Sequence, residues 1–359
     1  MTTGRYDRFG LTANPFRDLA SESLEDVEIF HVRLQVDESL RTVKEEVLEK
    51  ENHALVAIVG ALGAGKTQRL KLAAAEARDR GAFLVYVDVP SKGVDAIGAI
   101  AEGFSKSARL GGFARTFAPP GWLRDLGAAA KPRGGSWDPV RAGKAIGTAL
   151  SANAPGFLLL NDLHNLTPAT EIPAIARMLQ AASDALKPGA LVMFSCYPNF
   201  LAAVVRSFPA LGTRINRTVT LPTLTPDEAG LLLAKKLLAK RLVEEIDPLF
   251  PFDAGAVAVL NTAAAGNPRR LLEIADRVLE YATDHRTYRV DAGVVQLTLD
   301  ASMTAPATAP AVPAEAARPP TARSEPSRTP PPSGVPATAA RTPAHDGSAA
   351  LPSASPTRP

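Results

Sequence analysis

The feature that most constrains the fold is a glycine-rich segment, GALGAGKT, at residues 60–67. It fits the pattern G-x-x-x-x-G-K-[ST], in which glycines let the backbone bend tightly and turn its N–H groups toward an anion. The apolar run ALVAIVG (54–60) precedes it, and the helical pattern TQRLKLAAAEARDR (67–80) follows. This order predicts a phosphate-binding loop that points the positive end of a helix at the anion.

Each part of the loop has an expected task. Lys66 is placed to reach the β and γ phosphates of a nucleotide, and Thr67 to ligate Mg²⁺. ATP and Mg²⁺ are therefore the expected cofactors. The alternative, a glycine-rich turn without a ligand, is disfavoured because motif and placement agree. The residues expected to contact the nucleotide are Gly60, Ala61, Leu62, Gly63, Ala64, Gly65, Lys66, Thr67 and Gln68.

Short apolar runs alternate with helical patterns along the first two thirds of the chain. Continuous apolar runs are typical of parallel strands buried on both faces, so we expect an α/β fold with a parallel sheet covered by helices. The expected strands are residues 54–60, 83–89, 157–161, 191–196 and 217–221. After them the pattern is helical only, beginning with a capping box at Thr225 and Glu228.

These patterns predict four parts. We expect an N-terminal linker at 1–37, an ATP-binding α/β domain at 38–223, a small helical lid at 224–301 and a disordered tail at 302–359. The tail holds 14 of the 31 prolines, and its apolar residues are almost all alanine. Such a segment buries too little surface to offset its ordering entropy. Its RTPPPSGVP stretch resembles proline-rich ligands, so a protein partner is the alternative to a purely solvated tail.

The strand FLLLN is followed directly by Asp162. A phosphate-loop site needs a carboxylate near Mg²⁺ at the tip of a neighbouring strand, and hydrolysis needs a group that activates water. If Asn161 lies on the metal side, Asp162 activates the water. If Asp162 faces the metal, the next residue is Leu163, which activates nothing. An amide is a weaker ligand than a carboxylate for a hard cation, although its oxygen still coordinates. A third alternative is that Asp162 only caps a loop.

Overall composition favours a soluble cytoplasmic protein. The N-terminus has no apolar segment typical of a signal peptide, and no apolar run approaches the roughly 20 residues of a membrane helix. The single cysteine, Cys196, suits a reducing compartment. The formal net charge of +3 gives no strong indication of nucleic-acid binding.

Residues 104–150 are more basic than the rest of the chain. Basic side chains with interleaved aromatics suit a phosphate backbone or a single strand, so this stretch is the candidate DNA contact. The alternative is a solvated loop whose aromatics pack on the protein's own core. The basic residues are Lys106, Arg109, Arg115, Arg124, Lys131, Arg133, Arg141 and Lys144, against Asp125 and Asp138, with Phe113, Phe117 and Trp122 between them.

In their order, these motifs resemble the AAA+ ATPases. FGLTANPF at 9–16 looks like the N-terminal FGL-x-x-x-PF signature of the group that contains the general-secretion ATPase and transposition-helper (TniB-like) proteins. LHNL at 163–166 is similar to that group's DEAHNL, a match that places Asn161 on the metal side and Asp162 at the catalytic acid. The resemblance covers roughly residues 8–299, and extends more loosely to archaeal origin-recognition ATPases.

The resemblance implies roles for three further residues. Ser195, in FSCYP, matches a sensor near the γ-phosphate, with Cys196 as the second choice. Arg214, in TRINRTVTL, matches an arginine finger that acts on a neighbouring subunit's nucleotide, with Arg217 as the alternative. Arg269, in GNPRR, matches the lid arginine that reaches the γ-phosphate. The arginine finger implies a homo-oligomer.

Two functions follow as expectations. One is a nucleotide-dependent switch that acts on DNA or a protein assembly and hydrolyses ATP slowly. The other is a nucleotide-binding scaffold without significant hydrolysis. A small-molecule kinase is disfavoured because the chain has a GNPRR lid and no evident substrate-binding insertion.

Overall fold

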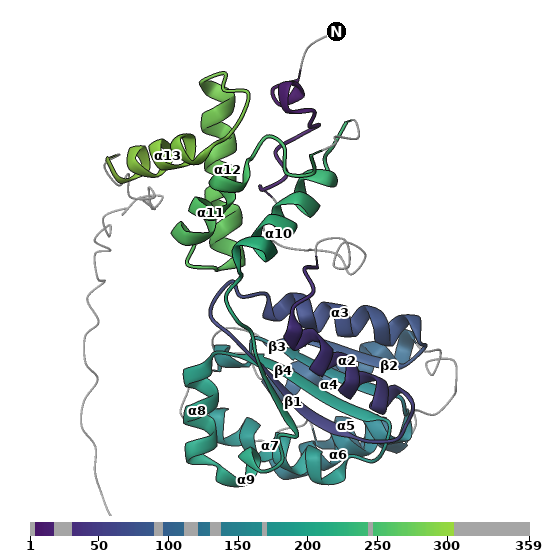
Figure 1. Cartoon of the computed structure of the whole chain (residues 1–359). Coiled ribbons are helices and arrows are strands. Elements are labelled where there is room, and N and C mark those ends of the chain that lie inside the picture. The colour runs from purple at the N-terminus through teal and green to yellow at the C-terminus, as the bar shows by residue number, and fades with distance from the viewer. Residues whose placement is uncertain are drawn as a thin grey trace, which may run out of the picture. The chain divides into compact units, whose positions relative to one another are not determined.

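The central element is a five-stranded parallel sheet with strand order β2-β3-β4-β1-β5 (Figure 1). The computed structural model describes residues 4–17, 31–89, 96–110, 121–129, 138–166, 171–242 and 247–304. The expected α/β fold is confirmed. The strands are β1 (Ala54–Val59), β2 (Phe83–Asp88), β3 (Gly156–Asn161), β4 (Ala190–Cys196) and β5 (Arg217–Thr220).

The strand register brings polar side chains together at one edge of the sheet. Because all strands are parallel, their carboxyl ends meet at this edge. There Asp88, the last residue of β2, pairs with Asn161, the last residue of β3. Ser195 of β4 pairs with Ile58 of β1, and β4 lies between β3 and β1. Strand β1 then leads directly into the glycine-rich loop, so the loop and these strand ends share one edge.

Helices cover both faces of the sheet (Figure 1). The three inner strands are buried along their whole length, as their continuous apolar sequences predict. One face packs against α2 (Gln35–Leu48) and α3 (Lys66–Asp79). The other face packs against α4 (Ala96–Leu110), α5 (Gly121–Ala129), α6 (Pro139–Ala152), α7 (Glu171–Ala185) and α8 (Pro198–Ser207).

Helices α6 and α7 approach each other unusually closely at a glycine. A Cβ placed on Gly143 would lie only 2.2 Å from the carbonyl oxygen of Met178. We expect Gly143→Ala to lower the free energy of unfolding by about 1–3 kcal/mol, because the two backbones must separate. The matched control is Gly127→Ala on α5, where a Cβ meets nothing within 4 Å. Chemical denaturation of both variants tests this, and equal stability would contradict the close packing.

The C-terminal part of the described chain is helical. The capping box at Thr225 is present, since its hydroxyl accepts from Glu228 N at 3.3 Å and Glu228 accepts from Thr225 N at 2.8 Å. The helices here are α10 (Pro226–Leu238), α11 (Ala254–Ala263), α12 (Pro268–Asp284) and α13 (Ala292–Thr304). Helix α13 runs three residues beyond the lid boundary that we expected at 301.

The N-terminal segment packs into the helical core, although we expected residues 1–37 to be a linker. Phe9, Leu11 and Phe16 are completely buried in the same apolar cluster as α10–α13. Asn14 Nδ2 donates to Asp276 on α12 at 2.8 Å. The FGLTANPF segment therefore belongs to the core of the helical region. Helix α2 begins at Gln35, just before the expected domain boundary.

The basic stretch at 104–150 is described only in part, and Arg115, Lys131, Arg133, Phe113 and Phe117 lie outside the described residues. Trp122 packs against Phe83 and Phe104, with ring centroids 5.7 and 6.5 Å away. Trp122 is partly buried and packs on the protein's own core, which is the second of the two alternatives.

The proline-rich tail lies outside the described residues from position 305. Over the part of the chain that the structure describes, no helix has both the length and the apolar character to cross a membrane.

Candidate functional site

The glycine-rich loop has the tight conformation that its sequence predicts. Gly63 and Gly65 have φ angles of +78° and +91°, in the left-handed region that favours glycine. Helix α3 begins immediately afterwards at Lys66, so its first N–H groups point into the loop. A strand, a left-handed glycine loop and a helix N-terminus together form an anion-binding cradle.

Lys66 lies folded back on its own loop. Its ammonium donates to the carbonyl oxygens of Gly60 (3.0 Å) and Ala61 (2.9 Å), and it lies 4.6 Å from the centre of the Tyr197 ring. Burial lowers the pKa of Lys66, while the charge of Asp162 partly opposes this. No carboxylate within the described ranges lies in ion-pair contact with it, so the ammonium is available for an anion such as a phosphate.

Asn161 is the centre of a hydrogen-bond network. Its Oδ1 accepts from Thr67 Oγ1 at 3.1 Å and from Ser195 Oγ at 2.9 Å. Its Nδ2 donates to Asp88 Oδ1 at 2.9 Å and to Asp162 Oδ2 at 3.3 Å. The amide is thus oriented with its oxygen toward Thr67 and its two donors toward the two carboxylates.

The sequence left open which of Asn161 and Asp162 lies beside Thr67, and the two residues have different surroundings in the structure. Asn161 is 5% exposed and in contact with Thr67. Asp162 lines the pocket described below, and its backbone has φ +56°, an unusual angle for a residue other than glycine. Aspartate and asparagine tolerate this region better than most residues, and such angles cluster at functional sites. Asn161 is therefore the residue in contact with Thr67, and Asp162 is the residue that faces the pocket.

Ser195 lies beneath the pair and does not line the pocket. It is completely buried on β4, where its hydroxyl donates to Asn161 Oδ1 and accepts from Asp162 N at 2.8 Å. Cys196, the second choice for the sensor, is also buried, and burial raises the pKa of its thiol to about 12. The structure therefore places Ser195 where it positions residues 161 and 162.

We expect Ser195→Ala to lower the free energy of unfolding by about 1–3 kcal/mol, because it leaves the partly buried N–H of Asp162 without its acceptor. Ser195→Thr keeps the hydroxyl and is the matched comparison, although its added methyl group must fit into the core. Thermal unfolding measures both. A Ser195→Ala variant as stable as the wild type would show that the hydroxyl does not hold residues 161 and 162.

The helical region contributes the opposite wall of the site. Asn267 caps α12 by accepting from Arg270 N, and its Nδ2 donates to Leu62 O of the loop at 2.7 Å. Arg269 N donates to Gly63 O at 3.4 Å, and the exposed Arg269 side chain lies 3.7 Å from Glu273. The N-terminus of α12 therefore docks on the phosphate loop and brings Arg269 to it. Arg270 is the next residue of the same helix.

The loop, the strand ends and the helical region enclose one pocket of about 260 Å³, near the lower end of small-ligand sites. Arg269 is among the residues that line it. Residues that the sequence did not single out also line it. These are Lys71, His164, Tyr197, Leu232, Lys236, Pro268 and Leu272, beside the predicted Leu62, Gly63, Gly65, Lys66, Thr67, Gln68 and Asp162.

The two finger candidates lie away from this pocket. Arg214 Nε donates to Asp184 at 2.5 Å, and its Nη1 donates to Ala210 O at 3.0 Å. Arg217 is exposed at the start of β5. An arginine finger acts on a neighbouring subunit, so its distance from its own pocket neither supports nor opposes that role.

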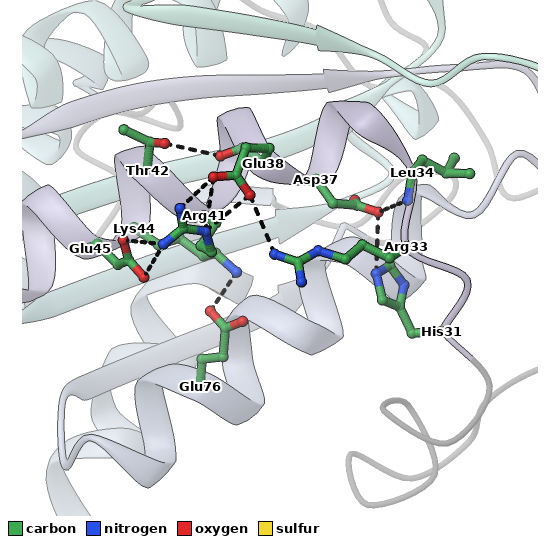
Figure 2. A network of polar contacts seen from close by, with 10 residues as sticks. All are labelled: His31, Arg33, Leu34, Asp37, Glu38, Arg41, Thr42, Lys44, Glu45 and Glu76. Atoms are coloured by element: carbon green, nitrogen blue, oxygen red, sulfur yellow. Dashed lines mark hydrogen bonds and ion pairs between the residues drawn. The ribbon is translucent and has the colours of Figure 1, made fainter.

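A polar network runs along residues 31–45, which include most of α2, and reaches α3 through the Lys44–Glu76 ion pair (Figure 2). Asp37 accepts from Leu34 N at 2.7 Å, and His31 lies 3.2 Å from it. Its other partner is the buried guanidinium of Arg69, at 3.1 Å. Burial raises the pKa of Asp37, but the His31 hydrogen bond and the Arg69 charge outweigh it and lower the pKa well below the usual value. Lys235 on α10 donates to His31 O at 2.6 Å, so the network also reaches the helical region.

Three solved structures are among those similar to this chain. The Aeropyrum pernix ORC2 protein, solved in ADPNP-ADP complexes, is 15% identical over 78% of this chain and 72% of its own, with a TM-score of 0.50. Cdc6p from Pyrobaculum aerophilum is 16% identical over 77% and 71%, with a TM-score of 0.49. The Thermotoga maritima RuvB Holliday junction branch migration motor is 18% identical over 79% and 73%, with a TM-score of 0.44. No protein-family model and no curated protein sequence matches the chain.

Sheet order, loop and helical region together define the fold of the AAA+ P-loop ATPases. The likeness to the Aeropyrum pernix ORC2 protein supports this fold assignment. At 15% identity the likeness extends to the fold and not to the activity.

The residues present fit a nucleotide with Mg²⁺. The loop offers N–H groups and Lys66 to phosphates, and the Thr67 hydroxyl lies 3.1 Å from the Asn161 oxygen, so the two are close enough to ligate one ion. No cluster of three or more His, Cys, Asp or Glu suited to a metal occurs within the described ranges. Mg²⁺ does not need one, because it retains several waters and binds through one or two protein oxygens together with substrate phosphates.

Proposed function

We propose that the chain is an AAA+ ATP-binding protein that acts as a nucleotide-dependent switch on DNA or a protein assembly and hydrolyses ATP slowly. The observation that carries this proposal is the shared pocket, in which Lys66 and Thr67 of the loop face Arg269 at the start of α12. A γ-phosphate there would contact both regions, and hydrolysis would remove that link. Such a difference between the ATP and ADP states is what a switch requires.

Slow hydrolysis is supported by the network around Asn161. The metal-side position beside Thr67 holds an amide, and Asp162 is the carboxylate that faces the pocket. Asp162 is the proposed water-activating residue, one methylene shorter than a glutamate. Ser195 is proposed to hold both residues in place from beneath. Arg214 is proposed as the finger that completes a neighbour's site in a homo-oligomer.

A scaffold without significant hydrolysis is the second candidate. It is favoured by the same amide and by the position of Ser195, which is completely buried, bonded to Asn161 and not among the pocket-lining residues.

A steady-state ATPase assay over a range of protein concentrations, with and without duplex DNA, separates the two candidates. The switch predicts low turnover that rises with protein concentration as subunits assemble, or with DNA. Turnover at background under every condition would support the scaffold. Fast turnover that is independent of concentration would contradict both.

A further inference from the structure

Asn161 occupies the position where a carboxylate is expected beside Mg²⁺, and the adjacent strand β2 ends in an acid, Asp88. We propose that Asp88, at the end of β2, is a positioning residue of the nucleotide site, which supplies the metal-side negative charge and holds the Asn161 oxygen toward Thr67. This inference rests on the proposed ATP-binding function. It assigns to Asp88 the charge that a carboxylate at position 161 would otherwise bring.

The register of the sheet places Asp88 where it can take this role. Asp88 and Asn161 are paired residues of adjacent parallel strands, so their side chains emerge from the same face of the sheet. Asn161 Nδ2 donates to Asp88 Oδ1 at 2.9 Å. The Asp88 carboxylate is therefore hydrogen-bonded to the Asn161 amide nitrogen, and the oxygen of the same amide contacts Thr67.

The orientation of the Asn161 amide follows from the charges around it. Its NH₂ group has two donors and no acceptor, and it faces the carboxylates of Asp88 and Asp162. The reversed amide would point its oxygen at both carboxylates, which is unfavourable. The hydroxyls of Thr67 and Ser195 both donate to the oxygen, and either could also accept. The carboxylates therefore decide which end of the amide faces the metal position.

Asp88 and Asp162 have separable positions. Asp162 lines the pocket and its backbone N–H is held by Ser195, which suits a group facing the phosphates. Asp88 is not among the residues that line the pocket and is joined to the site by its hydrogen bond with Asn161. Tyr86 is two residues earlier on the same face of β2. Burial, with the charges of Asp88 and Asp162, raises its pKa, so its hydroxyl stays neutral and adds no charge to the site.

The test measures how strongly Mg²⁺ enhances nucleotide affinity. Titrations with a fluorescent ATP analogue, in EDTA and in MgCl₂, give this enhancement for the wild type and three variants. Asp88→Asn keeps an acceptor for Asn161 Nδ2 and removes the charge. Asp88→Asn combined with Asn161→Asp returns the charge to the neighbouring strand. Asp79→Asn, an exposed acid at the end of α3, is the matched control.

We expect Asp88→Asn to reduce the Mg²⁺ enhancement about 10-fold or more, the usual effect of losing a residue that orients a metal ligand. The double variant should recover most of the enhancement, and Asp79→Asn should retain all of it. Unchanged enhancement in Asp88→Asn would overturn the inference, as would equal losses in EDTA and MgCl₂ or a double variant no better than the single one. A wild type that binds no nucleotide in either buffer would overturn the proposed function and this inference together. Binding by the wild type with no effect of Asp88 would overturn the inference alone.

Discussion

The Lys66→Ala variant should bind MgATP about 100-fold more weakly than the wild type, because a charge-assisted hydrogen bond to phosphate is lost. Within the described part of the chain, the ammonium donates to the carbonyl oxygens of Gly60 and Ala61 and lies beside the Tyr197 ring, and no carboxylate pairs with it. Its principal role is therefore toward a ligand, and the fold should survive its removal. Fluorescence titration gives the affinity, and thermal unfolding shows whether the variant folds.

Lys187→Ala provides the control, since Lys187 is exposed and lies between α7 and β4, away from the pocket. It should bind as the wild type does. Wild-type affinity in a folded Lys66→Ala variant would mean that the loop does not hold the phosphates through this lysine.

The second large effect is expected for Asn161→Asp. Without Mg²⁺, this change removes both hydrogen-bond donors to Asp88 and Asp162 and places a third carboxylate between them, at a position that is 5% exposed. A buried charge without compensation should cost about 3 kcal/mol of folding free energy. With Mg²⁺ and nucleotide, the same carboxylate becomes a better ligand than the amide, so stability should recover and turnover should rise.

The pH dependence of this variant has a definite sign. The new carboxyl group should have a pKa above its value in the unfolded chain, because two like charges face it. The folded state then binds more protons than the unfolded state between the two pKa values, so the loss of stability should grow as pH rises through this window. Denaturation at pH 5 and pH 8, in EDTA, measures it against Asn161→Ser, which adds no charge. A deficit that neither pH nor Mg²⁺ changes would show that Asn161 does not lie between the two acids.

Local patterns were sufficient to predict the sheet and the phosphate loop. Each strand is a continuous apolar run, and the loop motif lies between a strand and a helix, so both follow from neighbouring residues. Thr225 and Glu228 are three residues apart, so their capping box could also be predicted from neighbouring residues. Arg269 lines the pocket, and only the resemblance pointed to it; its contact with a γ-phosphate stays a prediction.

Contacts between distant segments were not predictable in this way. Asp88 ends a predicted strand, but its importance depends on the register that pairs it with Asn161, 73 residues later. Asn14 packs against α12, more than 260 residues away, so the N-terminal segment was mistaken for a linker. For Trp122 the sequence left both base contact and core packing open, and the structure shows it in an aromatic cluster with Phe83 and Phe104. Strand order and tertiary packing decide all three.

The most direct test of a slow nucleotide switch is the fate of one equivalent of bound ATP. Wild-type protein is mixed with stoichiometric α-labelled ATP and Mg²⁺, passed through a desalting column and quenched after about one minute. An enzyme with a typical turnover of about 10 per second completes hundreds of cycles in that time. The switch predicts that nucleotide elutes with the protein mainly as intact ATP, and that Lys66→Ala retains none. Elution of protein without nucleotide, or with ADP alone, would contradict it.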